Sequence, residues 1–532
     1  MTPNIADIIR QHVSLSVSCI DRLYLHAYMP KLQTSGGLCY FLRDHRGYPI
    51  PSPALFRPLH DRFITEVEQF VARHHIPKVA FESRQDKDAL VAGYRARCRA
   101  REGVVILGVA QEKMRSFKAH KCGGRGPAVS FDFSRQLVAV NHYYFYIQDR
   151  DWGPAFLKIG TYLPYPVKLC LNGHEWVKQR LRRDRIRFES LDNGFLSCGD
   201  PAALQAACDA LGPADVQAFF DRWSHRLPWP MTPADRAAGY DHRLAICQLE
   251  ASLTHVFTRP VQGRHFFEAV IRENLDLGRP DRVGLLFPVR ITRTTPPPAY
   301  GYRTRVITEG VQPSLHVEYK HSHVKQYFKE QHALRTETTI NNPKDFYVNK
   351  GIDNLPHLRD LGHQVNRKLL EVERVSHQCV LTQEALDRLQ CPTVEAGQRA
   401  SALRFGDPRV MALLQGLAGF THLPRGFRNR DLRPQVDALL GRPYTHTQMT
   451  YDLRRLRLKG VIHRIPKTHR YTATTYGLKV AFFYSKLYLR ILRPQWNGLL
   501  PETDHLPRSL RTALDQLEHE INKIYEEATL AA

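Results

Sequence analysis

Three residues have the types and the order needed for metal-assisted phosphate chemistry. Asp281 follows a proline, and Glu318 and Lys320 stand later in the segment Glu318-Tyr319-Lys320. Carboxylate oxygens are ligands that suit Mg²⁺, and a lysine beside them can polarise an attacking water. The alternation of apolar and polar residues over 315–319 predicts a strand that carries Glu318 and Lys320 on one face. We therefore predict Asp281 and Glu318 as metal ligands and Lys320 as a catalytic residue.

This order satisfies the loose PD…ExK pattern and is similar to that of restriction-type nucleases, which implies Mg²⁺ or Mn²⁺ as a cofactor. A second candidate site gathers the carboxylates of the N-terminal half, Asp21, Asp149 and Asp151. It resembles folds in which acidic residues at strand ends hold two metal ions. No P-loop, nucleophile elbow or HExxH motif occurs. The residues alone leave the two metal sites open as alternatives.

A charged, aromatic segment over 315–340 predicts a β hairpin. A turn at Glu330-Gln331-His332 would give one apolar face and one basic, aromatic face for a partner. A helical stripe is the alternative, but the threonine-rich run 336–339 favours a strand because β-branched residues suit a pleated surface. The predicted cross-strand pairs are Phe328 with Leu334, Val324 with Thr338, Lys325 with Glu337, and Tyr327 with Arg335.

Within this hairpin, Tyr327-Phe-Lys329 followed by Leu334-Arg335-Thr-Glu337 resembles a stretch of the rolling-circle replication initiators of filamentous phages and small plasmids. The resemblance covers 319–341 and implies catalytic roles for Tyr327 and Glu337. The chain departs from the pattern because serine, and not an apolar residue, separates His321 from His323. On the basic face of the hairpin we expect contacts with nucleic acid from Lys325, Lys329 and Arg335.

Composition points to a polyanionic partner. The 532 residues contain 76 Lys and Arg against 52 Asp and Glu, which gives a net charge of +24 and a pI near 9.7. Such an excess favours nucleic acid over a membrane surface. No run of 18 apolar residues and no CxxC pair occurs, so we expect a cytoplasmic protein with reduced thiols and no membrane partner.

Elements predicted along the first half would position these residues. A long strand over 14–30 carries Asp21, and a basic loop covers 113–125. A helix beginning near Asn172 is rich in cations, and residues 235–256 are interpreted as the longest helix of a helical region. The cations expected to contact phosphates from the first of these helices are Lys178, Arg180, Arg182 and Arg183.

The last third predicts three helices, a hairpin and a fourth helix, over 409–417, 430–440, 447–459, 461–472 and 474–492. Met449, Leu453 and Leu456 fall on the core face of the third helix. The run DLRRLRLKGVIHRIPKTHRYTATTYG resembles the winged helix-turn-helix of MarR- and ArsR-type regulators over about 405–493. The resemblance implies DNA-groove contacts from Gln448, Tyr451, Arg454 and Arg455, and phosphate contacts from Lys467 and Arg470.

The fold class predicted is α+β and multidomain, with a mixed α/β N-terminal part, a central β-rich region and a C-terminal winged helix. The predicted divisions are 1–128, 129–200, 201–295, 296–400, 401–495 and 496–532. The last contains an amphipathic helix over 508–525 that is expected to pack on the winged helix or, as the alternative, to mediate self-association. We expect a nucleic-acid-binding protein, with DNA favoured over RNA, and a metal-dependent endonuclease of a mobile element or defence system. The alternatives are a non-catalytic regulatory or architectural DNA-binding protein and a partner of a structured RNA. The whole chain resembles a family of bacterial proteins.

Overall fold

The computed structural model describes most of residues 11–487. The exceptions are 83–84, 99, 123–129, 262, 265–266, 268–282, 284–285, 288, 290–293, 300, 303, 310–311, 331, 378–382, 396, 421–425 and 467. The predicted C-terminal amphipathic helix, within 496–532, therefore lies outside the described residues. The chain divides into two compact units, 1–377 and 378–532, and the mixture of helices and strands confirms the α+β class.

A large twisted sheet organises the first unit. Within the described residues it has eleven strands in the order β10-β11-β12-β13-β9-β1-β6-β5-β4-β3-β2, and all neighbours are antiparallel except β2 and β3. The strands are β1 Val13–Tyr28, β2 Lys78–Ala80, β3 Gly103–Cys122, β4 Ser130–Asp149, β5 Gly153–Gly160, β6 Val167–Asn172, β9 Arg243–Phe257, β10 Arg305–Glu309, β11 Gln312–Tyr319, β12 Ser322–Lys329 and β13 Ala333–Ile340. The sheet thus takes strands from all four of the segments predicted before residue 400.

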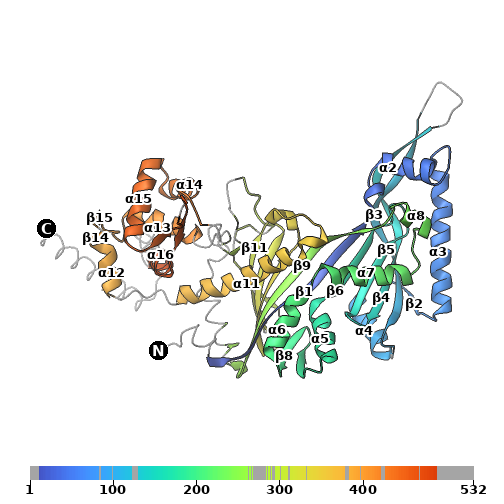
Figure 1. The fold of residues 1–532 in the computed structure, drawn as a ribbon, viewed down its shortest axis with the longest axis horizontal. Helices are drawn as coiled ribbons and strands as arrows, with labels where there is room; N and C mark the ends of the chain where they lie inside the picture. Colours follow the sequence, from blue (N-terminus) through green and yellow to red (C-terminus); the bar gives the residue numbers. More distant parts are fainter. Residues whose placement is uncertain are drawn as a thin grey trace, which may run out of the picture. The chain divides into compact units, whose positions relative to one another are not determined.

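Helices cover parts of this sheet (Figure 1). They are α2 Ser35–Tyr40, α3 Phe56–Arg73, α4 Lys87–Arg97, α5 Gly173–Arg183, α6 Pro201–Ala210, α7 Pro213–Arg226, α8 Pro233–Ala237 and α11 Leu355–His377, with a small hairpin of β7 Phe188–Leu191 and β8 Gly194–Cys198. Helix α11 packs on β9 and β13, where Asn366 Nδ2 donates to the carbonyl of Ala251 at 2.8 Å. A side chain at Gly362 would clash with Ala251 Cβ at 2.6 Å, so glycine permits this close approach.

Two predicted elements of the first unit are wrong. Residues 235–256 do not form one helix, because they contain the short α8 and the strand β9. Residues 113–122 are not a loop but the second half of β3, which pairs with β4 from Gly103 to Cys122. In both cases strand pairing overrides the local pattern: β9 pairs with the distant strand β1, and β3 pairs with β4, the next strand along the chain.

The second unit contains α12 Gln383–Gln390, β14 Thr393–Glu395, β15 Gln398–Ala400, α13 Pro408–Phe420, α14 Asn429–Leu440, α15 His446–Leu458, β16 Ile462–Arg464, β17 Tyr471–Ala473 and α16 Thr475–Leu487. Helix α15 begins with a capping box between Thr445 and Gln448 and buries Met449, Leu453 and Leu456 against α13 and α14 in one core. Among the described residues of the whole chain, no helix has the length and apolar character that a membrane crossing requires.

Candidate metal centre

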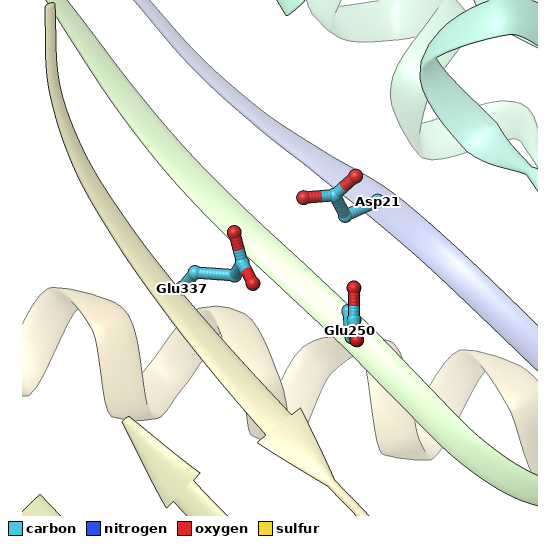
Figure 2. Close-up of side chains that lie close together, drawn as sticks. All are labelled: Asp21, Glu250 and Glu337. Carbon is cyan, nitrogen blue, oxygen red and sulfur yellow. The ribbon is translucent and has the colours of Figure 1, made fainter. Parts of the chain in front are cut away.

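Three carboxylates meet on neighbouring strands of the large sheet. Asp21 on β1, Glu250 on β9 and Glu337 on β13 each offer a carboxylate oxygen, and these oxygens all lie within 4.8 Å of one another (Figure 2). Asp21 and Glu337 are only 2% and 3% exposed, whereas Glu250 is partly exposed. Carboxylates brought this close in a dry site repel one another unless cations lie among them.

Strand register explains why the three side chains share a face. Glu250 stands opposite Thr339, two residues from Glu337, so both carboxylates are on the same side of the pleat. Between Ile20 and Leu23 the register of β1 against β9 shifts, which leaves Asp21 and Arg22 together opposite Glu250. This β-bulge re-aims a side chain on β1 next to the carboxylates of the other two strands.

Cations surround two of the three carboxylates. Arg335 is fully buried and its guanidinium is paired with Asp21, while its Nε lies 3.4 Å from Glu337 Oε2. Lys325 Nζ lies 2.9 Å from Glu337 Oε1, and the Tyr327 hydroxyl donates to Glu337 Oε2 at 3.3 Å. Among the residues that the structure describes, the buried Arg335 Nε has no hydrogen-bond acceptor, which leaves a donor unsatisfied beside the carboxylates.

Arg335 is held from behind by residues of the α5–β8 segment. It donates to the carbonyl of Asn193, whose side-chain amide in turn donates to Asp21. It also lies 3.0 Å from His174 Nε2, and burial lowers the pKa of His174, so its ring is neutral and can accept this hydrogen bond. The guanidinium is therefore a fixed part of the site.

Glu250 is the least neutralised carboxylate. Burial, followed by the negative charges of Glu337 and Asp21, raises the pKa of Glu250 to about 7, although Arg22 and Lys325 act in the opposite direction. Gln248 Nε2 donates to Glu250 Oε1 at 2.9 Å. Burial and the charge of Glu337 also raise the pKa of Tyr327, so its hydroxyl stays protonated at neutral pH. A divalent cation among these oxygens would remove the repulsion that raises the pKa of Glu250.

The predicted hairpin is confirmed, and it supplies part of the site. All four predicted cross-strand pairs occur between β12 and β13, including Lys325 with Glu337 and Tyr327 with Arg335. Lys325, Tyr327 and Glu337 are in the cluster. Arg335 is buried in its ion pairs, so the prediction that it contacts a partner directly is wrong.

The site predicted from Asp281, Glu318 and Lys320 is not assembled as expected. Asp281 lies outside the described residues, and Glu318 is paired with Arg305 at 2.6 Å. The prediction that Glu318 and Lys320 share a strand face is wrong, because β11 ends at Tyr319. Lys320 begins the turn to β12 with a φ of 48°, and its Nζ lies over the Tyr319 ring.

Asp149 and Asp151 have a structural role, so the predicted grouping of these two residues with Asp21 is also wrong. Asp149 accepts hydrogen bonds from the backbone amides of Asp151 and Trp152, from Trp223 Nε1 at 2.7 Å and from Arg222 at 2.8 Å. Arg222 also pairs with Asp151 at 2.6 Å. These contacts close the β4–β5 turn, and Arg222 and Arg183 together balance the charges of the two carboxylates.

Sequence reasoning missed Glu250 because its segment was interpreted as a helix. One signal could have found it. From Gln248 to Thr254 the polar residues alternate strictly with Leu249, Ala251 and Leu253, which is the period of a strand with one polar face. The apolar run of residues 244–247 directly before it obscures this short alternation.

The other predicted contacts of the first unit differ in exposure. Lys178 is buried and donates to Glu175 Oε1 at 2.7 Å and to two backbone carbonyls, so the prediction that it contacts phosphate is wrong. Arg180 lies over the Trp176 ring, and the exposed Arg182 lies over Phe188. Arg183 is exposed and pairs with Asp151, and Lys329 pairs with Glu330.

On α15, one of the predicted DNA contacts is wrong. Arg455 is only 8% exposed, because it pairs with Asp452 and donates to the carbonyl of Ser401. Arg454 and Tyr451 are exposed, and Gln448 is exposed although its side chain caps the helix through Thr445. Arg470 donates to the carbonyl of Gly426, and Lys467 lies outside the described residues.

No protein-family model, curated protein or solved structure matches the chain. The chemistry of the residues themselves is therefore the basis for interpreting the site.

Proposed function

We propose that the chain binds nucleic acid, DNA rather than RNA, and cleaves its phosphodiester backbone with a divalent cation at Asp21, Glu250 and Glu337. The observation that supports this most is the meeting of three carboxylates on adjacent strands in a chain of net charge +24. An all-carboxylate donor set suits Mg²⁺ or Mn²⁺, and the partly exposed Glu250 leaves the site open to solvent.

The surrounding residues would each have a defined task. The cation would supply a Lewis acid for a phosphoryl oxygen and for water. Lys325 and Arg22 would attract the phosphate, since both carry charge beside Glu250. Water oxygen would bond to phosphorus as the bond from phosphorus to the leaving deoxyribose oxygen breaks. The attacking water would release one proton to solvent, and the leaving oxygen would take up one proton in exchange. Tyr327, protonated and hydrogen-bonded to Glu337, is placed to donate a hydrogen bond at this site.

Cleavage assays test this proposal. Labelled single- and double-stranded DNA and RNA are incubated with Mg²⁺ or Mn²⁺ and then with EDTA. We expect metal-dependent cleavage of DNA that Asp21→Asn and Glu337→Gln abolish and that the control Asp151→Asn retains. Substrates left intact by the wild type under every condition would overturn the nuclease proposal.

A non-catalytic DNA-binding function is a second candidate, favoured by a specific observation. Arg335 and Lys325 already pair with Asp21 and Glu337, so the cluster could serve as a buried ion-pair network. In that case DNA binding would survive both substitutions and no cation would bind. Preferential retention of structured RNA would instead support the RNA-binding alternative.

For the second unit we propose a winged helix that uses α15 to contact DNA. The order of α13, α14, α15, the β16–β17 hairpin and α16 supports this. The neighbours Arg454, exposed, and Arg455, buried, form a matched pair. We expect Arg454→Gln to weaken duplex binding and to reduce its salt dependence by about one counterion. Arg455→Gln should mainly lower the melting temperature, and a reversal of the two effects would contradict the proposal.

A further inference from the structure

A second site in the first unit is a cavity of about 490 Å³ between α3, the end of α7 and the segment that leads into α8. Its lining residues come from segments other than the strands that carry the three carboxylates, so it is separate from the candidate metal centre. Leu227, Pro228, Met231 and Pro233 give it apolar walls, and Trp229 lies among them. The volume falls within the range of about 300–1,000 Å³ that is usual for small-molecule sites.

Trp229, which lines the cavity, carries a buried donor. The residue is 6% exposed, and its indole Nε1 is sealed from solvent and makes no hydrogen bond within the described part of the chain. In contrast, Nε1 of the equally buried Trp223 donates to Asp149 at 2.7 Å. A buried N–H without an acceptor is costly, so a small shift of the Trp229 ring that turns Nε1 toward an oxygen of a ligand in the cavity would be favoured.

Two arginines, Arg236 and Arg62, and one carboxylate, Glu66, line the same cavity. The guanidinium of Arg236 lies 5.3 Å from the centroid of the Trp229 ring and donates to the carbonyl of Ser224 at 2.7 Å. Among the described residues no carboxylate forms an ion pair with it, although Asp241 and Asp221 act on its charge from a greater distance. Arg62 donates to the carbonyl of Pro230 at 2.5 Å, has a buried Nε without a hydrogen bond, and is 3.6 Å from Glu66.

We infer that this cavity binds a nucleoside monophosphate. Backbone carbonyls fix both guanidinium groups, so their remaining donors can take a phosphate without further ordering. Arg236 is the stronger phosphate contact, because Glu66 offsets part of the charge of Arg62. The apolar walls accept the ring system, and Trp229 Nε1 donates to an oxygen of the ligand. The inference does not depend on the metal centre.

Calorimetry and tryptophan fluorescence with AMP test this inference on the full chain. We expect saturable binding of AMP that inorganic phosphate competes for and that adenosine alone reproduces poorly. Trp229→Phe and Arg236→Gln should each weaken binding by about 10-fold or more, as expected for the loss of a hydrogen bond to a charged group.

The matched control is Arg226→Gln. Arg226 also lies over a tryptophan, at 5.6 Å from the Trp223 ring, but it pairs with Glu102 at 2.9 Å outside the cavity. Melting temperatures establish that each variant is folded. If Trp229→Phe does not fold, the AMP affinity of Arg236→Gln alone tests the inference. Three results would overturn the inference: no AMP binding at millimolar concentration, adenosine binding as tightly as AMP, or equal weakening in Arg226→Gln.

Discussion

Two acidic groups of the same unit differ in how completely their charges are satisfied. At the β4–β5 turn, Asp149 accepts from two backbone amides, Trp223 and Arg222, and Arg222 binds Asp151 with its other amino group. On β1, β9 and β13, three carboxylates have two direct ion-pair partners, Arg335 and Lys325. The first group is a finished structural network, whereas the second retains excess negative charge.

The difference shows which observation separates a structural carboxylate from a candidate ligand. Burial does not, because Asp149 and Asp21 are 1% and 2% exposed. The distinction lies in the balance of charge and donors around each oxygen. Burial and neighbouring carboxylates raise the pKa of Glu250 to about 7, while Arg222 and Arg183 help to lower the pKa of Asp151 against the opposing effect of burial.

The largest expected effect is on folding stability. Asp149→Ala would leave Arg222 and the indole of Trp223 without their buried acceptor, so we expect a loss of about 3–5 kcal/mol in the free energy of unfolding. Glu250→Gln removes repulsion and should leave stability unchanged or increase it. Chemical denaturation followed by tryptophan fluorescence measures both. Equal losses in the two variants would erase the contrast between the two groups.

Divalent cations should stabilise the protein through the carboxylate cluster alone. A cation that binds only the folded state adds about 2.7 kcal/mol at a hundred times its Kd. Thermal scans with Mg²⁺ and Mn²⁺ should therefore show a higher Tm for the wild type and for Asp151→Asn. Asp21→Asn and Glu337→Gln should lose the increase. An unchanged Tm in the wild type would assign the cluster to structure.

The raised pKa of Glu250 should make a measurable contribution to the pH dependence of the free energy of unfolding. Its folded-state pKa of about 7 lies above the ordinary value of 4.5, so the folded state binds the proton more tightly. Its contribution to stability therefore falls as the pH rises from about 4.5 to 7, by at most a few kcal/mol, since one pKa unit corresponds to about 1.4 kcal/mol.

The difference in the free energy of unfolding between the wild type and Glu250→Gln isolates the contribution of Glu250. Glu373, with a pKa raised by burial to about 8, acts with the same sign, and His242, with a pKa lowered by burial to about 4, acts with the opposite sign. Both cancel in the comparison of denaturation midpoints at several pH values. Saturating Mg²⁺ should make the stability difference between the two proteins independent of pH. If the stability of the wild type relative to Glu250→Gln rises with pH, the raised pKa is not that of Glu250.

The sequence predicts what is local in this structure. The β12–β13 hairpin follows from a period of two and a short turn, and the helices of the second unit follow from spaced apolar residues such as Met449 and Leu453. The cluster could not be predicted, because it requires β13 to pair with β9 and β9 with β1, far apart in the chain.

The sequence also does not show which cationic side chains are buried. Lys178, Arg335 and Arg455 have the same residue types as exposed phosphate contacts. The acceptors that only the tertiary structure brings to them are, in that order, the carbonyl of Leu191, the carboxylate of Asp21 and the carbonyl of Ser401. The sequence predicts Tyr327 and Glu337 as site residues. It does not predict Glu250, because the short alternating stretch that contains it lies in a segment interpreted as a helix. Charge patterns therefore indicate a class of partner and do not identify the side chains that are free to contact it.

The smallest expected effect on the free energy of unfolding is that of the exposed ion pair at the β4–β5 turn. Arg183 pairs with Asp151 at 3.1 Å, but its side chain is 57% exposed, so water competes for the interaction. Arg183→Gln should change the free energy of unfolding by no more than about 1 kcal/mol, the usual value for a surface pair, and less at high salt. Arg222→Gln, at 14% exposure with the same acidic partner, is the matched variant and should destabilise by several-fold more. Similar losses of unfolding free energy in Arg183→Gln and Arg222→Gln would mean that charge alone, and not the burial of the donor, stabilises the turn. Buried donors would then not distinguish the carboxylate cluster from the turn either.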